Sequence, residues 1–413
     1  MNAERATQIR PSLAEPASDS RTTDNMSLNV LIQRARELYE DIDLLAVRRW
    51  KDAVPGRKAI GHMPIYVPRE LIHAAGMLPV GIVGGGDRLE IIRGDALFQS
   101  YICRIPRSTI ELALSGRLDA LDGMLFPSIC DVIRNLSGMW KMLFPDTYVR
   151  YVDVPQNFDR PVGGMFWRRE LEQLRGDFAH MAGRAISDED LRLSIAVYNE
   201  NRAAIRELYR RRSQRPWVFP LSEVYLFLRA GNVLPPEEHT VLIREYLRAA
   251  PLDTTRREQD HSRVVLTGMF CEQPPHGLLV TLERAGCAVV DDDLLLGLRW
   301  ITEDIAVDGD PLGNLVDAYL FASASSASRY APDGDRARWL LDSFARNKAE
   351  GVMFCAPSFC DPALLEQPML VAELDRRKVP HTEFKYSEDT GQFAVIREQA
   401  GTFSDSIRLW SEA

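Results

Sequence analysis

The chain has 413 residues, of which 46% are apolar and 26% are charged, so it is long enough to form two or three domains with filled cores. Its formal net charge of −9 argues against nucleic acid or an anionic membrane surface as a partner, because the overall field repels both. The most apolar stretch, residues 71–83, is interrupted by Gly76, Pro79 and Gly81 well short of the ~20 residues that cross a bilayer. We therefore expect no membrane span.

Residues 1–27 are predicted to form a mobile tail, because they are rich in Ser, Thr, Arg, Asp and Glu and contain no apolar stretch. The tail does not have the pattern of a secretory leader, and six cysteines without close spacing favour a reducing compartment. The expected location is therefore the cytoplasm. Residues 28–57 are predicted to form an N-terminal helical segment, since apolar residues recur at helical spacing from Leu28 to Trp50.

The rest of the chain is predicted to alternate between strands and helices, except in its middle. A first α/β lobe is expected at 58–159, with strands at 59–60, 78–83, 123–126 and 148–152. Residues 160–260 show no strand pattern but long amphipathic stretches, such as 187–212 and 236–249, and are predicted to be a helical insert. A second α/β lobe is expected at 261–413, with strands at 263–268, 288–290, 351–356 and 381–385 and helices at 275–285, 339–349 and 362–377. The predicted fold class is α/β, with two doubly wound parallel-sheet lobes, a helical insert and an N-terminal helix.

The two predicted lobes share a short motif at the end of a strand. Residues 127–131 and 357–361 each read Pro-Ser, one apolar residue, then Cys-Asp, after an apolar run. In a doubly wound sheet, loops at the carboxyl ends of the strands form the ligand crevice, and the next helix points its first amides into it. If two such loops face each other, Cys130 and Cys360 come within reach of one small ligand.

Cys103 is a third candidate, because Arg104 and Arg107 follow it and nearby cations favour a thiolate. Three thiolates from separate strand ends can hold an iron–sulfur cluster and leave one iron open. The long separations between Cys103, Cys130 and Cys360 exclude a compact zinc-ribbon or ferredoxin motif. The alternative for each cysteine is plain core packing, since cysteine is among the most buried residue types.

The other cysteines and the glycine run favour structural interpretations. Cys287 begins a strand and Cys355 lies inside one, so both are predicted to be buried. Cys271 lies at a strand end and could border a site, although packing is favoured. The run Gly84–Gly86 lacks the G-x-G-x-x-G order of a dinucleotide site and is predicted to be a flexible loop.

Two runs of charged residues also have structural interpretations. The run Arg210–Arg212 is predicted to be a solvated helix end, where cations offset the negative end of the helix dipole; the alternative is a clamp for a coenzyme phosphate. The run Asp291–Asp293 is predicted to be a helix-start turn, with a divalent-cation site as the alternative.

Several stretches resemble the 2-hydroxyacyl-CoA dehydratase and benzoyl-CoA reductase superfamily, over nearly the whole chain after the tail. They are residues 63–76, the segment around Cys103, residues 126–131, residues 289–293 with Gly297 and Arg299, and residues 358–362. Residues 101–111, 131–140 and 397–403 look like the ring-reducing branch rather than a dehydratase. The extra tail and Cys355 depart from the family pattern.

The resemblance implies that Cys103, Cys130 and Cys360 bind a [4Fe–4S] cluster. It also implies a CoA thioester substrate, a homologous B subunit, ATP-hydrolysing activator subunits and ferredoxin as the electron source. The expected function is the cluster-bearing subunit of an enzyme that reduces the ring of benzoyl-CoA. The alternatives are a 2-hydroxyacyl-CoA dehydratase subunit and a non-catalytic electron-transfer subunit of such a complex.

Overall fold

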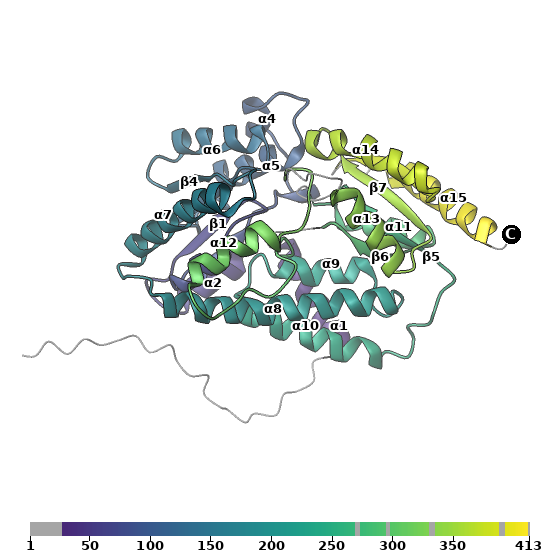
Figure 1. Ribbon diagram of the computed structural model, residues 1–413, viewed down its shortest axis with the longest axis horizontal. Coiled ribbons are helices and arrows are strands. Elements are labelled where there is room, and N and C mark those ends of the chain that lie inside the picture. Colours follow the sequence, from purple (N-terminus) through teal and green to yellow (C-terminus); the bar gives the residue numbers. More distant parts are fainter. Residues whose placement is uncertain (1–26, 269–272, 295–297, 330–334, 388–392, 412–413) are drawn as a thin grey trace, which may run out of the picture.

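The computed structural model describes residues 27–268, 273–294, 298–329, 335–387 and 393–411 (Figure 1). These residues include two four-stranded sheets in which every strand pair is parallel, with helices packed around both. The predicted α/β class with two lobes is confirmed. Within the described ranges, no helix is both long and apolar enough to cross a membrane.

The first sheet has the strand order β2-β1-β3-β4. Its strands are β1 (Ala59–His62), β2 (Leu78–Gly81), β3 (Gly123–Pro127) and β4 (Tyr148–Val152), so all four predicted strands form. The helices of this lobe are α3 (Arg69–Ala74), α4 (Arg93–Leu97), α5 (Arg104–Leu114) and α6 (Asp131–Leu143), with a 3-10 turn, η1 (Gly86–Arg88). β3 is buried along its whole length, as expected of an inner strand of a parallel sheet.

The second sheet repeats this arrangement, with the order β6-β5-β7-β8. Its strands are β5 (Ser262–Thr267), β6 (Cys287–Asp292), β7 (Gly351–Pro357) and β8 (His381–Tyr386). The helices are α11 (His276–Arg284), α12 (Pro311–Phe321), α13 (Asp335–Arg346), α14 (Asp361–Arg377) and α15 (Phe393–Ser411). β7 therefore occupies the position in its sheet that β3 occupies in the first, and the two Pro-Ser-x-Cys-Asp motifs lie at equivalent strand ends.

The N-terminal segment forms two helices rather than the single helix predicted. α1 (Leu28–Glu40) ends at Asp41, and α2 (Leu45–Asp52) begins after Leu44, whose φ is 53°. The Asp41 carboxylate accepts hydrogen bonds from the backbone N–H groups of Leu45 and Ala46, both at 2.8 Å. This side chain stabilises a new helix start that competes with continuation of the first helix.

The middle of the chain is helical, as predicted. It contains η2 (Arg160–Gly164), α7 (Met165–Ala182), α8 (Asp188–Gln214), α9 (Leu221–Ala230), α10 (Pro236–Ala249) and η3 (Ala250–Leu252). Ser187 and Asp190 form a capping box that begins α8. α12, from the C-terminal part of the chain, packs against α7 and α8. The division into the five predicted segments stays a prediction.

One hydrophobic core joins the parts of the molecule that carry the cysteine motifs. It includes Leu125 of β3, Trp167 of α7, Tyr319 of α12 and Cys360 at the start of α14. The two lobes are therefore packed together where the two motifs lie, and this packing fixes the geometry of the site described below.

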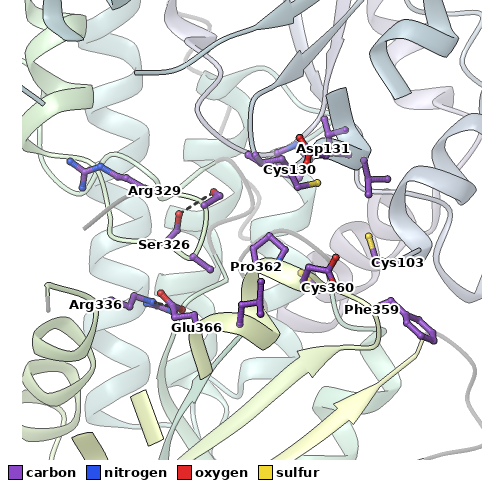
Figure 2. A pocket seen from close by; sticks show the side chains of 18 of the residues that line it. Cys103, Cys130, Asp131, Ser326, Arg329, Arg336, Phe359, Cys360, Pro362 and Glu366 are labelled. Atoms are coloured by element: carbon purple, nitrogen blue, oxygen red, sulfur yellow. Dashed lines mark hydrogen bonds and ion pairs between the residues drawn. The ribbon is translucent and has the colours of Figure 1, made fainter. Parts of the chain in front are cut away.

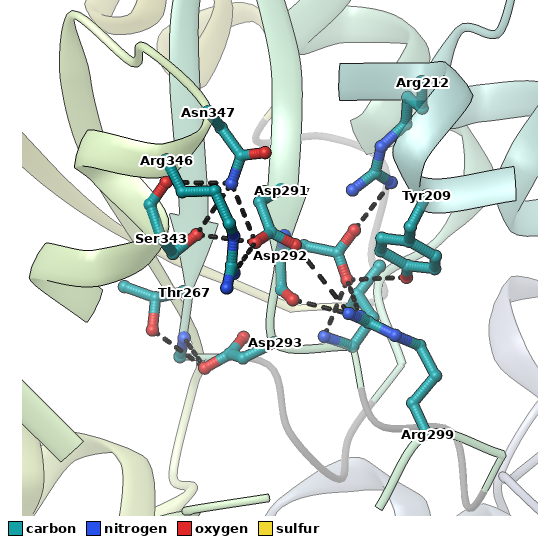
Figure 3. A network of polar contacts seen from close by, with 12 residues as sticks. Tyr209, Arg212, Thr267, Asp291, Asp292, Asp293, Arg299, Ser343, Arg346 and Asn347 are labelled. Carbon is teal, nitrogen blue, oxygen red and sulfur yellow. Dashed lines mark hydrogen bonds and ion pairs between the residues drawn. The ribbon is translucent and has the colours of Figure 1, made fainter. Parts of the chain in front are cut away.

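Arg210 is exposed and Arg211 is partly exposed near the end of α8, as predicted, but Arg212 and the aspartate run depart from their predictions. Arg212 is not solvated: its side chain is fully buried and its Nη1 lies 2.7 Å from Asp292 Oδ2 (Figure 3). Asp291 and Asp292 are the last residues of β6 and Asp293 follows it, and the arginines Arg299 and Arg336 pair with them. Burying a charge is tolerated when it is paired, and the partners come from positions distant in the sequence.

Candidate metal centre

The three predicted cysteines line one cavity between the lobes. This cavity has a volume of about 1010 Å³, and Cys103, Cys130 and Cys360 all contribute to its wall (Figure 2). Apolar side chains such as Ile129 and Met369 form much of the rest. The sequence prediction that these cysteines share one site is therefore consistent with their placement.

Each of the three cysteines is the residue immediately before a helix. Cys103 precedes α5, Cys130 precedes α6 and Cys360 precedes α14. The first amides of a helix have no partner within the helix, and its dipole favours negative charge at that end. Three helix N-termini therefore converge on the cavity, where they favour thiolates or sulfides.

The pKa of the Cys130 thiol shows the balance of forces at this site. Burial raises this pKa, hydrogen bonds from the backbone N–H groups of Ile133 and Val132 lower it, and the neighbouring Cys360 raises it. Two thiolates this close repel each other, so the cysteines by themselves favour the neutral form. Metal ions bound between them would remove that repulsion and hold them as thiolates.

The donor set consists of three thiols, the ligand type that iron–sulfur clusters use. Among the described residues, no three His, Cys, Asp or Glu side chains are close enough together to hold one ion. In a cluster each thiolate binds a different iron, so the donors stand further apart than around a single ion. A set of thiolates in a largely apolar cavity matches the ligands that iron–sulfur clusters use.

The end of the cavity away from Cys103 is polar, and no sequence pattern pointed to it. Ser326, Arg329, Arg336 and Glu366 lie there (Figure 2). Ser328 lies beside Ser326, with their hydroxyl oxygens 3.3 Å apart. The buried hydroxyl of Tyr66 is hydrogen-bonded to Ser326 and lies 3.3 Å from Ser328.

Tyr66 adopts a φ of 66°, which is uncommon for a tyrosine, and this conformation brings its hydroxyl to the serines. Since Tyr66 precedes Ser326 by most of the chain, no local sequence signal links them. Only the small-residue run around Ser326 could have pointed to a loop.

The remaining cysteines agree with their predictions where they are described. Cys287 and Cys355 are fully buried. Burial raises the pKa of Cys287 to about 12 and that of Cys355 well above its usual value, so neither is a ready thiolate. Cys271 lies outside the described residues.

The glycine run Gly84–Gly86 forms a loop, as predicted, and its last residue begins η1.

Comparison with known proteins places the chain in a family. Residues 64–407 match the family model described as "2-hydroxyglutaryl-CoA dehydratase, D-component". The chain therefore belongs to this family. It is 55% identical over 387 residues to the C subunit of benzoyl-CoA reductase of Thauera aromatica, covering 94% of this chain and 100% of the relative. It is also 29% identical over 359 residues to the beta subunit of (R)-2-hydroxyglutaryl-CoA dehydratase of Acidaminococcus fermentans, covering 85% and 93% of the two chains. The beta subunit of lactoyl-CoA dehydratase of Anaerotignum propionicum is 29% identical over 359 residues, with coverage of 86% and 93%. The family resemblance read from the sequence is confirmed.

Proposed function

We propose that this chain is the cluster-bearing C subunit of a benzoyl-CoA reductase. The observation that carries this proposal is 55% identity to such a subunit over that relative's whole length. The reaction reduces the aromatic ring of benzoyl-CoA to a cyclic dienoyl-CoA. Adding an electron to an aromatic ring is steeply unfavourable, so the site must exclude water and supply electrons of very low potential.

Cys103, Cys130 and Cys360 are the residues proposed to hold a [4Fe–4S] cluster, whose chemistry when bound is the delivery of single electrons at low potential. The protein contributes three things to this site. The cysteines supply the ligands, the first amides of α5, α6 and α14 lie where they can donate hydrogen bonds to sulfur, and the apolar wall limits access of water.

The proposed partners follow from the relatives, which are named as subunits of enzymes. We infer a homologous B subunit, ATP-hydrolysing activator subunits and ferredoxin as the source of electrons, with benzoyl-CoA as the thioester substrate. The proposed location is the cytoplasm, where the oxygen-sensitive site and its thiols stay reduced.

The direct test is an activity assay of the complex purified without oxygen. The complex should convert benzoyl-CoA to the dienoyl-CoA product when it is given ATP and reduced ferredoxin, and the product is identified by mass spectrometry. Turnover of 2-hydroxyglutaryl-CoA or lactoyl-CoA, with none of benzoyl-CoA, would contradict the proposal.

A dehydratase subunit is the second candidate, because the matched family model carries that name and relatives at 29% identity are dehydratase subunits. The same assay separates the two reactions, since dehydration releases water without net reduction. A non-catalytic electron-transfer role is a third candidate. It would be supported if Cys360→Ser abolished the cluster signal while ring reduction continued at its full rate.

A further inference from the structure

Three poorly exposed charged residues form a cluster at the cavity, here called the Arg336 triad: Arg336 and Glu366, which line it, and Asp293, which lies behind them. Arg336 donates hydrogen bonds to Asp293 Oδ2 and, from Nε, to Glu366 Oε2 at 3.0 Å. Their side chains are only 2%, 7% and 13% exposed, in the order Asp293, Arg336, Glu366. One cation thus faces two carboxylates in a poorly solvated place, and a bound proton would neutralise the excess negative charge.

The two carboxyl groups of the triad differ in their hydrogen bonds. The Oδ2 of Asp293 accepts hydrogen bonds from the Thr267 hydroxyl and the Gly268 backbone N–H, both at 2.8 Å, in addition to the one from Arg336. Such bonds favour the ionised form. Among the described residues, Arg336 alone donates a hydrogen bond to Glu366, which borders the cavity. Burial raises the pKa of Glu366, Arg336 lowers it and Asp293 raises it, and the net shift is upward. Of the two carboxyl groups, Glu366 is therefore the one that takes up a proton more readily.

Glu366 is close to the proposed cluster site along the same helix. Cys360 precedes α14, and Glu366 lies less than two turns further on, ~9 Å along the helix axis. Pro362, Glu366 and Met369 fall on one face at helical spacing, and all three line the cavity. Figure 2 shows Glu366 beside Arg336 at the end of the cavity away from Cys103.

Other acidic groups that line the cavity, or that contact its wall as Tyr66 does, are poorer proton donors. The carboxylates of Asp131 and Asp361 are exposed to solvent, and the side chain of Asp131 is 91% exposed. Burial raises the pKa of the Tyr66 hydroxyl above its usual value of 10.0, so it holds its proton more tightly than a carboxylic acid does. Glu366 and Glu373 are the partly buried carboxyl groups among the described residues of the wall, and hydrogen bonds from Arg376 and Arg377 lower the pKa of Glu373, so Glu366 is the better proton donor of the two.

We propose that Glu366 donates one of the two protons that ring reduction adds to the substrate. This inference rests on the proposed function. Reduction of the ring to a diene adds two electrons and two protons; the cluster that Cys103, Cys130 and Cys360 would hold would supply the electrons at low potential. In the step assigned here, the O–H bond of Glu366 breaks and a C–H bond forms on the ring that has accepted an electron. The Glu366 carboxylate that remains restores the excess negative charge of the triad, which favours uptake of a new proton from solvent.

The first test compares variants in the full complex purified without oxygen. Glu366→Gln should lower the rate of benzoyl-CoA reduction by about 10²-fold or more, since a positioned acid contributes roughly 10²–10⁴-fold. The paramagnetic resonance signal of the reduced cluster should be unchanged. Asp375→Asn is the matched control, because Asp375 lies on the same helix and its side chain is 68% exposed. A Glu366→Gln rate within a few-fold of the control rate overturns the proposal.

The second test does not depend on turnover. Infrared difference spectroscopy of the full chain at neutral pH should show the C=O stretch of a protonated carboxyl group that disappears in Glu366→Gln and persists in Asp375→Asn. Absence of that band overturns the proposal even if the complex reduces benzoyl-CoA. A wild-type complex that shows the band but does not reduce the ring refutes the proposed function instead, and with it the assignment of the proton to ring reduction.

Discussion

At the scale of single residues, the molecule separates cysteines that face a shared cavity from cysteines that fill the core. Cys103, Cys130 and Cys360 line the cavity, whereas Cys287 is fully buried and lies in the core of the second lobe. The same residue type therefore occupies two kinds of position: each cavity cysteine directly precedes a helix, whereas Cys287 is the first residue of the strand β6.

This contrast gives a prediction about iron content. Replacement of Cys103, Cys130 or Cys360 by Ala should remove most of the iron and sulfide from the chain purified without oxygen, because each replacement deletes one ligand. Cys287→Ala should keep wild-type iron content, since its cost is a small core cavity. Chemical iron and sulfide analysis makes the measurement. Wild-type iron in all three cavity variants would favour the plain packing alternative.

At the scale of elements, α4 packs against α5, the helix that begins directly after Cys103. Oε2 of Glu111, in α5, accepts hydrogen bonds from the backbone N–H groups of Ile92, Arg93 and Gly94 at 3.0, 2.6 and 2.8 Å. These are the amides at the start of α4, which otherwise have no partner within the helix. The side chain of one helix thus fixes the start of another beside the site.

Glu111→Ala should loosen α4 selectively, because it leaves three backbone donors without their carboxylate partner at a cost of roughly 1–3 kcal/mol. Hydrogen exchange of residues 92–97 should become faster, while exchange in β8, in the other lobe, should not change. Equal protection of residues 92–97 in the variant and the wild type would show that this carboxylate does not hold the helix.

The start of α8 gives a prediction about pH. Although burial alone would raise the pKa of Asp190, hydrogen bonds from the backbone N–H and hydroxyl of Ser187, together with Arg184, lower it below its usual value. A carboxyl group with a lowered folded-state pKa stabilises the protein above its unfolded-state pKa, and this contribution is lost as the pH falls through the folded-state value.

Asp190→Ala should therefore destabilise the start of α8 by ~1 kcal/mol at neutral pH, and by less in acid, where the wild-type carboxyl is protonated. Hydrogen-exchange protection of residues 187–191, corrected for intrinsic rates, measures the difference. An effect of Asp190→Ala that stays the same size in acid would argue that the carboxylate charge does not contribute.

At the scale of the whole molecule, α12 joins parts that are far apart in sequence. Tyr319 of α12 is fully buried in the same core as Leu125 of β3, and its hydroxyl donates a hydrogen bond to the carbonyl of Pro155 at 2.8 Å. Its ring also packs near those of Tyr66 and Trp167. A helix from the C-terminal part of the chain thus completes the core beneath the first sheet.

Tyr319→Ala should cost roughly 3–5 kcal/mol, as large-to-small changes of buried aromatic residues do. Tyr319→Phe should cost only about 1 kcal/mol, the value of one hydrogen bond. Because most of this core comes from residues 44–195, which include the first sheet, hydrogen exchange should accelerate in β1 and β3 more than in β7. Acceleration confined to the second lobe would show that α12 stabilises that lobe alone.

Local patterns were enough to predict the strands and the helices α8, α10 and α14, and the three cysteines that they singled out line one cavity. Each strand carries its own apolar run, and Cys130 and Cys360 follow the strands β3 and β7. Cys103, also predicted at a strand end, instead lies between the helices α4 and α5. Contacts between distant positions were not predictable in this way. Arg212 looked like a solvated helix end because its partner Asp292 comes much later in the chain, and the triad joins positions 293, 336 and 366. Buried ion pairs leave no periodic signal, so only the folded structure brings their members together.

The placement of the cysteines couples the proposed cofactor to the shape of the molecule. Two of the three, Cys103 and Cys130, belong to the first lobe, and Cys360 begins a helix of the second. A cluster bound to all three would be a covalent tie across the cleft, in addition to the packing between the lobes. If oxygen destroyed such a cluster, this covalent link would also be lost. Oxidative damage to the cluster would then weaken the association of the two lobes.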